Sequence, residues 1–333
     1  MNNFAIANCT TVDGALSQLK DGAVVKAGGV DLLDRMKNGV DQPSKLVNIR
    51  NISGLRGIHE TNDGLIIGAL TTLSEIEEHP VVRRQYQILA DACGSAATPH
   101  IRNMATLGGN LLQRIQCWYY RSADFACLRR GKDICFALNG LNQYHAIMDY
   151  GMCPAVAPSS AAVALLGLNA SIELTSAKKG NRTVPIDKLY VPAEADPEKF
   201  TVVEPDELMT SVTILKPASG TRSAYQKYGE KESFDWAIAD AGIVLEMDGN
   251  TCKRAVVTMG AASPIVRRSP QAEAALAGKP ITEANARAAG KAAMEGAQPL
   301  SMNAYKVDLF PIAIYRTILL AAGQMDRDPS AAG

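Results

Sequence analysis

The chain has 333 residues, 47% of them hydrophobic, and 34 Lys and Arg balance 34 Asp and Glu, so its net formal charge is zero. This length predicts two or three domains of about 150 residues, each large enough for its own core. The neutral balance argues against a nucleic-acid partner, and no apolar run reaches the roughly 18 residues of a membrane-spanning helix, so we expect no direct membrane insertion.

Residues 1–54 show the pattern of a small α/β unit. Thr11 is a suitable N-cap for a helix that runs to Lys20. A second helix is predicted with Asp31 as its N-cap and Gly39 just after its end. The strands expected here cover residues 23–27 and 45–50.

Residues 55–220 predict a longer mixed unit. A turn at residues 61–64 joins two strands, and the Thr72-x-x-Glu75 pattern is that of a capping box that opens a helix. The further elements expected here are helices over residues 81–93 and 160–168 and strands over residues 65–70, 170–175 and 207–215.

Residues 221–330 have a different pattern, in which strands come first and helices follow. Ser269, with Pro270 behind it, and Thr282 are good N-caps for two Ala-rich helices. The strands are expected over residues 223–228, 236–247 and 251–260, and a third helix over residues 305–322. This order predicts a separate α+β domain.

Two glycine turns are candidates for binding phosphate groups. Residues 27–31 read Ala-Gly-Gly-Val-Asp and residues 106–110 read Thr-Leu-Gly-Gly-Asn. Backbone amides in such turns can converge on an anion, because glycine accepts positive φ. Each alone is usually just a turn, and neither is a G-x-G-x-x-G or P-loop motif. Together they would suit a two-part ligand such as a dinucleotide.

The long segment over residues 113–157 lacks a periodic pattern but is rich in aromatic residues, so we expect it to be folded. It holds four of the seven cysteines: Cys117, Cys127, Cys135 and Cys153. Their wide spacing lacks the tight C-x(2–4)-C pair that is usual for zinc and suits a 4Fe-4S cluster better. Two disulfides, or four unrelated thiols, are the alternatives.

Charge in the same segment favours an anionic cluster. Residues 114–132 hold five cations and one carboxylate, namely Arg114, Arg121, Arg129, Arg130 and Lys132 against Asp124. Neighbouring cations would stabilise a cluster with four thiolates. The four histidines show no metal-binding spacing and are expected at the surface. The N-terminus has no secretory signal, so the chain is expected in the cytoplasm, or in the periplasm if a signal-bearing partner exports it.

Four stretches of the sequence resemble one family. They are KAGGVDLL at 26–33, GALTTL at 68–73, IRNxATLGGNL at 101–111 and SFDWA at 233–237. These motifs are similar, in the same order, to those of the FAD-binding medium subunit of the xanthine dehydrogenase and carbon monoxide dehydrogenase family. The cysteine segment resembles the branch with an extra 4Fe-4S cluster, known from 4-hydroxybenzoyl-CoA reductase and bacterial molybdenum aldehyde oxidoreductases.

The resemblance implies an α+β fold with a vanillyl-alcohol-oxidase (PCMH)-type FAD-binding domain. Its two α/β subdomains would span residues 1–54 and 55–220, the cysteine loop lying within the second. A C-terminal α+β domain of the CO dehydrogenase flavoprotein type would follow over residues 221–330.

The resemblance also implies site residues. Cys117, Cys127, Cys135 and Cys153 would ligate the cluster, and no residue of this chain is expected to be catalytic. Ser160 stands where relatives commonly have an aspartate that contacts FAD, so a weaker contact is expected there. The residues implied in FAD binding are Lys26, Ala27, Gly28, Gly29, Val30, Asp31, Leu32, Leu33, Ala97, Thr98, Thr106, Gly109, Asn110, Ser160 and Lys227.

The implied function is electron transfer inside a molybdenum hydroxylase-type oxidoreductase complex. The partners would be a small subunit with 2Fe-2S clusters and a large molybdopterin subunit that handles an aldehyde, an N-heterocycle or an aryl-CoA substrate, in a heterotrimer or its dimer. FAD exchanges electron pairs and iron–sulfur centres single electrons, so this chain would convert one into the other. The alternatives are an FAD-only subunit with a zinc or empty cysteine loop, and a redox-inactive assembly protein on the same fold.

Overall fold

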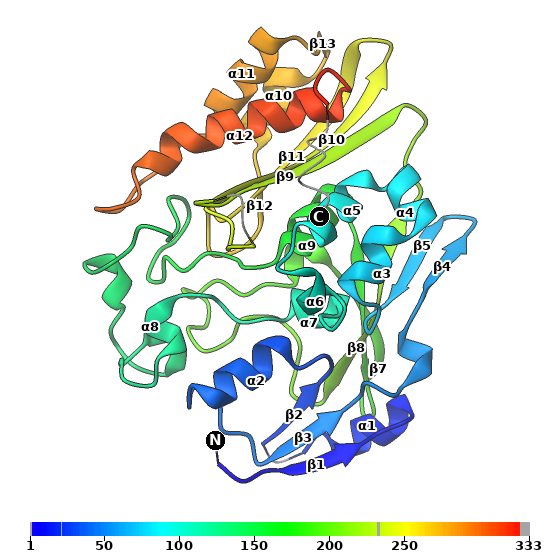
Figure 1. Ribbon diagram of the computed structural model, residues 1–333, viewed down its shortest axis with the longest axis vertical. Coiled ribbons are helices and arrows are strands. Elements are labelled where there is room, and N and C mark those ends of the chain that lie inside the picture. Colours follow the sequence, from blue (N-terminus) through cyan, green and yellow to red (C-terminus); the bar gives the residue numbers. More distant parts are fainter. Residues whose placement is uncertain (1, 21, 232–233, 327–333) are drawn as a thin grey trace.

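A computed structural model describes residues 2–20, 22–231 and 234–326, and the chain builds three sheets in succession (Figure 1). Ser233, the first residue of the SFDWA motif at 233–237, lies outside the described residues. The domain boundaries predicted after residues 54 and 220 fall between the sheets and stay predictions. Among the described residues, no helix is both long enough and apolar enough to cross a bilayer.

The first sheet is parallel, in the order β1-β3-β2. Thr11 caps α1 as predicted, because its hydroxyl accepts from the Gly14 amide at 3.1 Å. The prediction that Asp31 is the N-cap of α2 is wrong. Gly29 is the N-cap, with φ of 84°, and Asp31 already lies within the helix. The elements are β1 (Ala5–Asn8), α1 (Val12–Gln18), β2 (Ala23–Lys26), α2 (Val30–Lys37) and β3 (Lys45–Asn48).

The second sheet is antiparallel, in the order β4-β5-β8-β6-β7. The capping box is confirmed, since the Thr72 hydroxyl accepts from the Glu75 amide at 3.2 Å and the Glu75 carboxylate accepts from the Thr72 amide at 2.7 Å. The strands are β4 (Ile58–Thr61), β5 (Gly64–Gly68), β6 (Ser171–Ser176), β7 (Gly180–Pro185) and β8 (Glu207–Leu215).

The helices of this region differ in part from the prediction. The expected helix over residues 81–93 is two helices, because the buried Tyr86 leaves the helical conformation with φ of −129° and ψ of 46°. Strand β7 and helices α6 and α7 were not predicted. The helices are α3 (Leu73–Glu78), α4 (Pro80–Gln85), α5 (Gln87–Gly94), α6 (Pro99–Arg102), α7 (Leu107–Leu111) and α9 (Ser160–Gly167), with 3₁₀ turns at Ser53–Leu55 and Ile186–Lys188.

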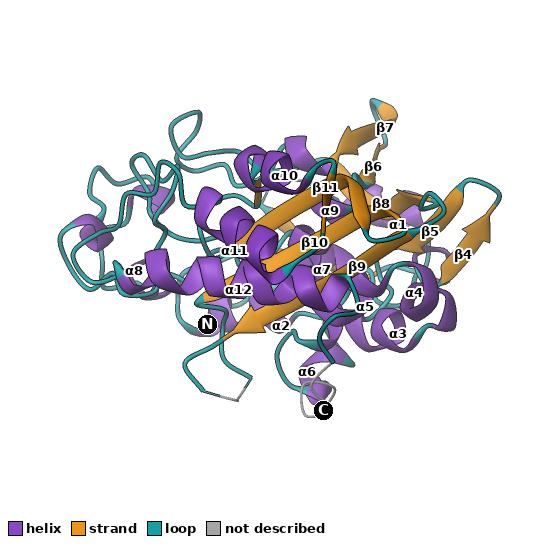
Figure 2. Ribbon diagram, turned by 90° about the horizontal axis from the view of Figure 1, so that it is seen from above, coloured by secondary structure: helices purple, strands orange, loops and turns teal. Residues whose placement is uncertain are grey.

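The third sheet, β12-β11-β10-β9, is antiparallel and has helices on both faces (Figure 2). Alternate residues of β10 divide between two cores: Ile243 packs with α10, α11 and α12, and Val244 packs with the core that holds α5 and α9. The elements are β9 (Thr221–Tyr228), β10 (Ala239–Asp248), β11 (Thr251–Gly260), β12 (Arg267–Arg268), α10 (Pro270–Leu276), β13 (Lys279–Pro280), α11 (Glu283–Ala292) and α12 (Tyr305–Ala321).

The cysteine segment, residues 113–157, extends to one side of the sheets in Figure 1 and is folded, as expected. It contains α8 (Trp118–Arg121) and 3₁₀ turns at Leu128–Arg130 and Phe136–Leu138. The ring of Tyr119 stacks on Phe136 with centroids 5.8 Å apart and meets Phe125 edge-on at 5.0 Å. Its hydroxyl also accepts from the Leu141 amide at 2.8 Å, so aromatic packing gives this segment a core.

Candidate functional site

A cavity of about 560 Å³ is lined by all three regions of the chain, which is a common size for a small-molecule site. Leu33 lies outside the lining because it packs with Leu32 and Met36, and Thr98 lies outside it because its hydroxyl caps α6 at Ile101. The other predicted FAD-binding residues line the cavity: Lys26, Ala27, Gly28, Gly29, Val30, Asp31, Leu32, Ala97, Thr106, Gly109, Asn110, Ser160 and Lys227.

The two glycine turns meet at this cavity. A Cβ atom on Gly28 would lie 2.0 Å from the backbone oxygen of Met104, so only glycine permits this approach. Gly29 takes a left-handed φ of 84° that turns β2 into α2. Thr106 stabilises the second turn, because its hydroxyl accepts from the Gly109 amide at 3.2 Å.

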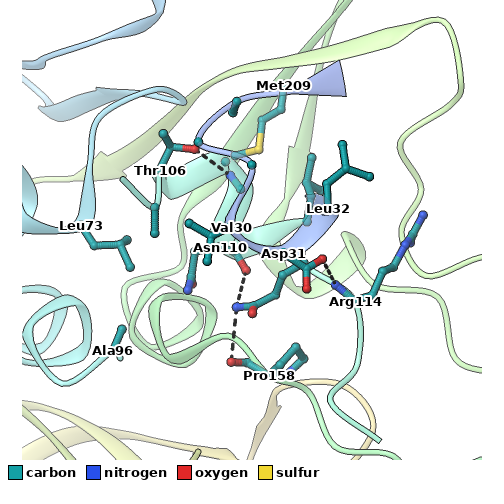
Figure 3. A pocket seen from close by; sticks show the side chains of 18 of the residues that line it. Val30, Asp31, Leu32, Leu73, Ala96, Thr106, Asn110, Arg114, Pro158 and Met209 are labelled. Carbon is teal, nitrogen blue, oxygen red and sulfur yellow. Dashed lines mark hydrogen bonds between the residues drawn. The ribbon is translucent and has the colours of Figure 1, made fainter. Parts of the chain in front are cut away.

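Hydrogen bonds join these turns to the cysteine segment and, through it, to Pro158 just before α9, as Figure 3 shows. The Arg114 amide donates to the Asp31 carboxylate at 3.1 Å. Gln113 Nε2 donates to the backbone oxygens of Asn110 at 3.0 Å and Pro158 at 3.4 Å. The Ser159 hydroxyl donates to Asn110 Oδ1 at 2.6 Å. The cavity wall is thus fixed by contacts between residues far apart in the sequence.

Asp31 would repel an anionic ligand if its charge were unbalanced. It forms ion pairs with Arg35, 3.1 Å away, and with Arg121, which also reaches Asp34 at 3.2 Å. These two guanidiniums offset the charge of Asp31, which lowers its repulsion of a phosphate-bearing ligand at the Gly28 turn. Arg121, one of the five cations counted in the cysteine segment, therefore pairs with the carboxylates of α2.

The opposite end of the cavity is formed by the third sheet and the residues after α5. Lys227 Nζ donates to the backbone oxygens of Ser95 at 2.6 Å and Asp235 at 3.1 Å, and burial lowers its pKa. Ala97 and Ala261 both line the cavity with left-handed φ values of 49° and 52°. Such strain in non-glycine residues is typical of ligand sites.

Sequence reasoning missed Tyr225 and Asp240, which line the cavity and are buried. Tyr225 donates to Asp240 Oδ2 at 2.7 Å. The available signal was a single carboxylate within the apolar run of β10, because a charge is rarely buried in a strand without a role.

The four cysteines of the segment come together beside the cavity. Cys127 and Cys153 are buried, and Cys117 packs against the same small core. Burial, with smaller contributions from the neighbouring Cys153 and Cys127 sulfurs, raises the pKa of Cys117 to about 12. Burial likewise raises the pKa of Cys135, with a contribution from Cys127. Each of the four thiols therefore lies within electrostatic reach of at least one other, and all are free.

The arrangement is not that of a site for one metal ion. Among the described residues, no group of three or more His, Cys, Asp or Glu side chains is arranged to hold one. His145 was expected at the surface, and this is wrong: it is 3% exposed and its Nε2 lies 3.2 Å from Cys117 Sγ. It is buried because the Trp118 ring packs edge-on against it, 5.4 Å between centroids.

Two arginines link the cavity to the cysteines through one aromatic ring. The guanidinium of Arg114, which lines the cavity, lies 4.4 Å from the centre of the Phe200 ring, and that of Arg129 lies 4.0 Å from it. Arg129 is buried within electrostatic reach of Cys153 and Cys127. The main cavity also shares wall residues with a small one beside Cys153, namely Gln113, Ala157, Pro158 and Thr201.

A buried lysine fastens the cysteine segment to the C-terminal helix. Lys306 on α12 is 0% exposed, and its Nζ donates to the backbone oxygens of Tyr144 and His145, each at 3.0 Å, and of Ala261 at 2.9 Å. Asn303 adds hydrogen bonds to the His145 and Ala146 oxygens at 3.0 and 3.1 Å. These contacts position the segment against the edge of the cavity.

We predict that Lys306→Met destabilises the protein by about 2–6 kcal/mol. The Tyr144 and Ala261 carbonyls lose the Lys306 donor, at about 1–3 kcal/mol each, while Asn303 still donates to the His145 carbonyl. Hydrogen exchange of the amides at residues 144–148 should accelerate at the same time. Lys291→Met, an exposed substitution on α11, is the matched control and should leave both measurements unchanged. Equal exchange rates in the Lys306 variant and the wild type would contradict the role of Lys306 as an anchor.

Comparison with known proteins identifies the class. Residues 2–217 match the family described as the FAD binding domain in molybdopterin dehydrogenase, and residues 223–321 match the CO dehydrogenase flavoprotein C-terminal domain. The chain is 34% identical over 246 residues to the aldehyde oxidoreductase FAD-binding subunit PaoB of Escherichia coli (strain K12), covering 72% of this chain and 76% of the relative.

Further relatives agree. The chain is 28% identical to the carbon monoxide dehydrogenase medium chain of Hydrogenophaga pseudoflava, over 93% of this chain and 88% of that one. The solved structure of the H. pseudoflava enzyme lacking its Mo-pyranopterin moiety has a TM-score of 0.75 at 26% identity, covering 98% and 99% of the two chains. The chain belongs to the family of FAD-binding medium subunits of the xanthine and CO dehydrogenases, and the α+β fold implied by the sequence is confirmed.

Proposed function

We propose that this chain is the electron-transfer subunit of a molybdenum hydroxylase-type complex and carries both FAD and a 4Fe-4S cluster. The observation that carries the proposal is that the cavity shares Gln113, Ala157, Pro158 and Thr201 with a small pocket lined by Cys153. Two redox groups in adjoining sites of this kind can exchange electrons. FAD would handle electron pairs and the cluster single electrons.

The residues present fit FAD. Gly28 and Gly29 line the cavity in a turn of the kind whose backbone amides can bind phosphate, and the ion pairs of Asp31 reduce its repulsion of a diphosphate. The fifteen residues named from the resemblance remain the proposed FAD contacts, with Leu33 and Thr98 acting from behind the lining. Ser160 faces the cavity with a neutral hydroxyl where relatives commonly have an aspartate.

The cysteine site fits a cluster in its donor chemistry. The thiols of Cys117, Cys127 and Cys153 pack in one small core, and the partly buried Cys135 lies within electrostatic reach of Cys127 and Cys153. The nearby Arg129 guanidinium would offset the negative charge of a cluster. The Arg129 guanidinium donates to neutral backbone oxygens, those of Asp196 at 3.4 Å and Lys199 at 3.0 Å, so these hydrogen bonds do not cancel its charge. Cys117, Cys127, Cys135 and Cys153 are the proposed ligands.

The proposed partners follow from the relatives, which are named as medium chains or FAD-binding subunits of larger dehydrogenases and oxidoreductases. A small 2Fe-2S subunit would exchange single electrons with this chain, and a large molybdopterin subunit would bind the organic substrate. The substrate class would be an aldehyde, an N-heterocycle or an aryl-CoA thioester. We propose the cytoplasm as the location, or the periplasm by export with a signal-bearing partner.

The test is to purify the full chain with its co-encoded neighbours and to measure flavin absorbance, iron and acid-labile sulfide. The proposal expects FAD together with a 4Fe-4S complement assigned to this chain. FAD with zinc, or with no metal in this chain, would support an FAD-only subunit. Absence of both cofactors would favour a redox-inactive assembly protein and overturn the proposal.

A further inference from the structure

Asp240 lies on the face of the third sheet that is turned toward the cavity. It pairs across the sheet with Lys227 on β9 and with Gly260 on β11, so these three residues share one face. A Cβ on Gly260 would lie 2.5 Å from both carboxylate oxygens of Asp240. The carboxylate therefore lies over the backbone of Gly260, where only a glycine leaves room for it.

This carboxylate is buried with one oxygen unused. Asp240 is 3% exposed, and Tyr225 donates to its Oδ2 at 2.7 Å. Within the described part of the chain, Oδ1 has no hydrogen-bond partner. Burying a charged oxygen without a hydrogen-bond partner costs free energy. We therefore expect Oδ1 either to bind a proton or to accept a hydrogen bond from a bound molecule.

The surroundings of Asp240 bring the pKa of its carboxyl group close to neutral pH. Burial raises its pKa to about 6, and the Tyr225 hydrogen bond and the positive charges of Lys306 and Lys227 limit the rise. Of the other neighbours, Gly260 on β11 and Val163 on α9 bring no charge. Behind Tyr225 and Lys227 lie Cys93 on α5, Arg102 on α6 and Asp235.

We propose that Asp240 is the proton-exchanging residue of the FAD cavity, taking up a proton when electrons enter the cavity and releasing it when they leave. The inference rests on the proposed FAD role of this site. Two electrons and their accompanying proton add net negative charge to the cavity, which favours protonation of the carboxylate that lines it. Solvent supplies the proton, the other centres of the complex supply the electrons, and on reoxidation both leave.

The test is the pH dependence of the FAD midpoint potential, measured on the full chain with FAD bound, or on its complex. In the wild type, one extra proton should accompany the two electrons over a pH window that begins at or above about pH 6. Asp240→Asn should abolish this extra proton. Tyr225→Phe should move the lower edge of the window to higher pH, because the Tyr225 hydrogen bond holds the pKa of Asp240 down.

Asp248→Asn is the matched control, since Asp248 is an exposed carboxylate at the far end of the same strand. Reduced-minus-oxidised infrared spectra should show the band of a protonated carboxyl group in the wild type and not in Asp240→Asn. A wild type without flavin would overturn the proposed function itself. Bound flavin with the same pH dependence in the wild type and Asp240→Asn would overturn this inference alone.

Discussion

Gly28→Ala should lower the affinity for FAD by about 5- to 150-fold. The new Cβ would lie 2.0 Å from the backbone oxygen of Met104, so the β2–α2 turn and the segment before α7 must move apart. Overpacking of this kind costs about 1–3 kcal/mol, and that range corresponds to the stated change in binding. The measurement is a titration with FAD, followed by the quenching of flavin fluorescence.

The matched control is Gly54→Ala in the same region of the chain. A Cβ on Gly54 would meet no heavy atom of the described chain within 4 Å, and its backbone needs no positive φ. This variant should bind FAD like the wild type. Circular dichroism separates a local effect at Gly28 from general unfolding. Unchanged FAD affinity in a folded Gly28→Ala protein would refute the role of the Gly28 turn in FAD binding.

Elements set by neighbours along the chain were predictable from sequence. The Thr72 and Glu75 capping box was predicted and found because its two partners lie three residues apart. The same holds for the Thr11 cap and for β11, whose bounds agree with the expected strand. In each case the hydrogen bonds are local or the apolar pattern is strong.

Elements set by distant contacts were not predictable. Asp31 has the composition of an N-cap, yet its carboxylate binds Arg114 and Arg121, more than eighty residues away in sequence. Tyr86 breaks a helix because its ring is buried in the main core. Strand β7 is an exposed edge strand whose burial shows little alternation, so periodicity does not reveal it.

The candidate site shows the same division. The glycine turns and the cysteine segment were found because glycine and cysteine patterns are visible in one dimension. Asp240 was missed because its significance arises from the register that sets it beside Lys227 and over Gly260. The wall that the cavity shares with the small pocket beside Cys153 depends on Thr201 and Pro158, whose residue types alone carry no signal.

Cys135→Ser should reduce the iron and labile sulfide of the chain to background while FAD remains bound. A serine hydroxyl is a far poorer ligand for iron than a thiolate, and three remaining cysteines do not complete the proposed set. Cys135 is only partly buried and does not line the FAD cavity, so the substitution should preserve both packing and flavin. Iron analysis and visible absorbance give the result.

Cys9→Ser supplies the control, because Cys9 lies outside the cysteine segment and packs in the core of the first sheet. This variant should keep both cofactors. Zinc in the wild type, or full iron retention in serine variants of Cys117, Cys127, Cys135 and Cys153 alike, would refute the cluster. Neither result would contradict the proposed FAD site, because none of these four cysteines lines the cavity.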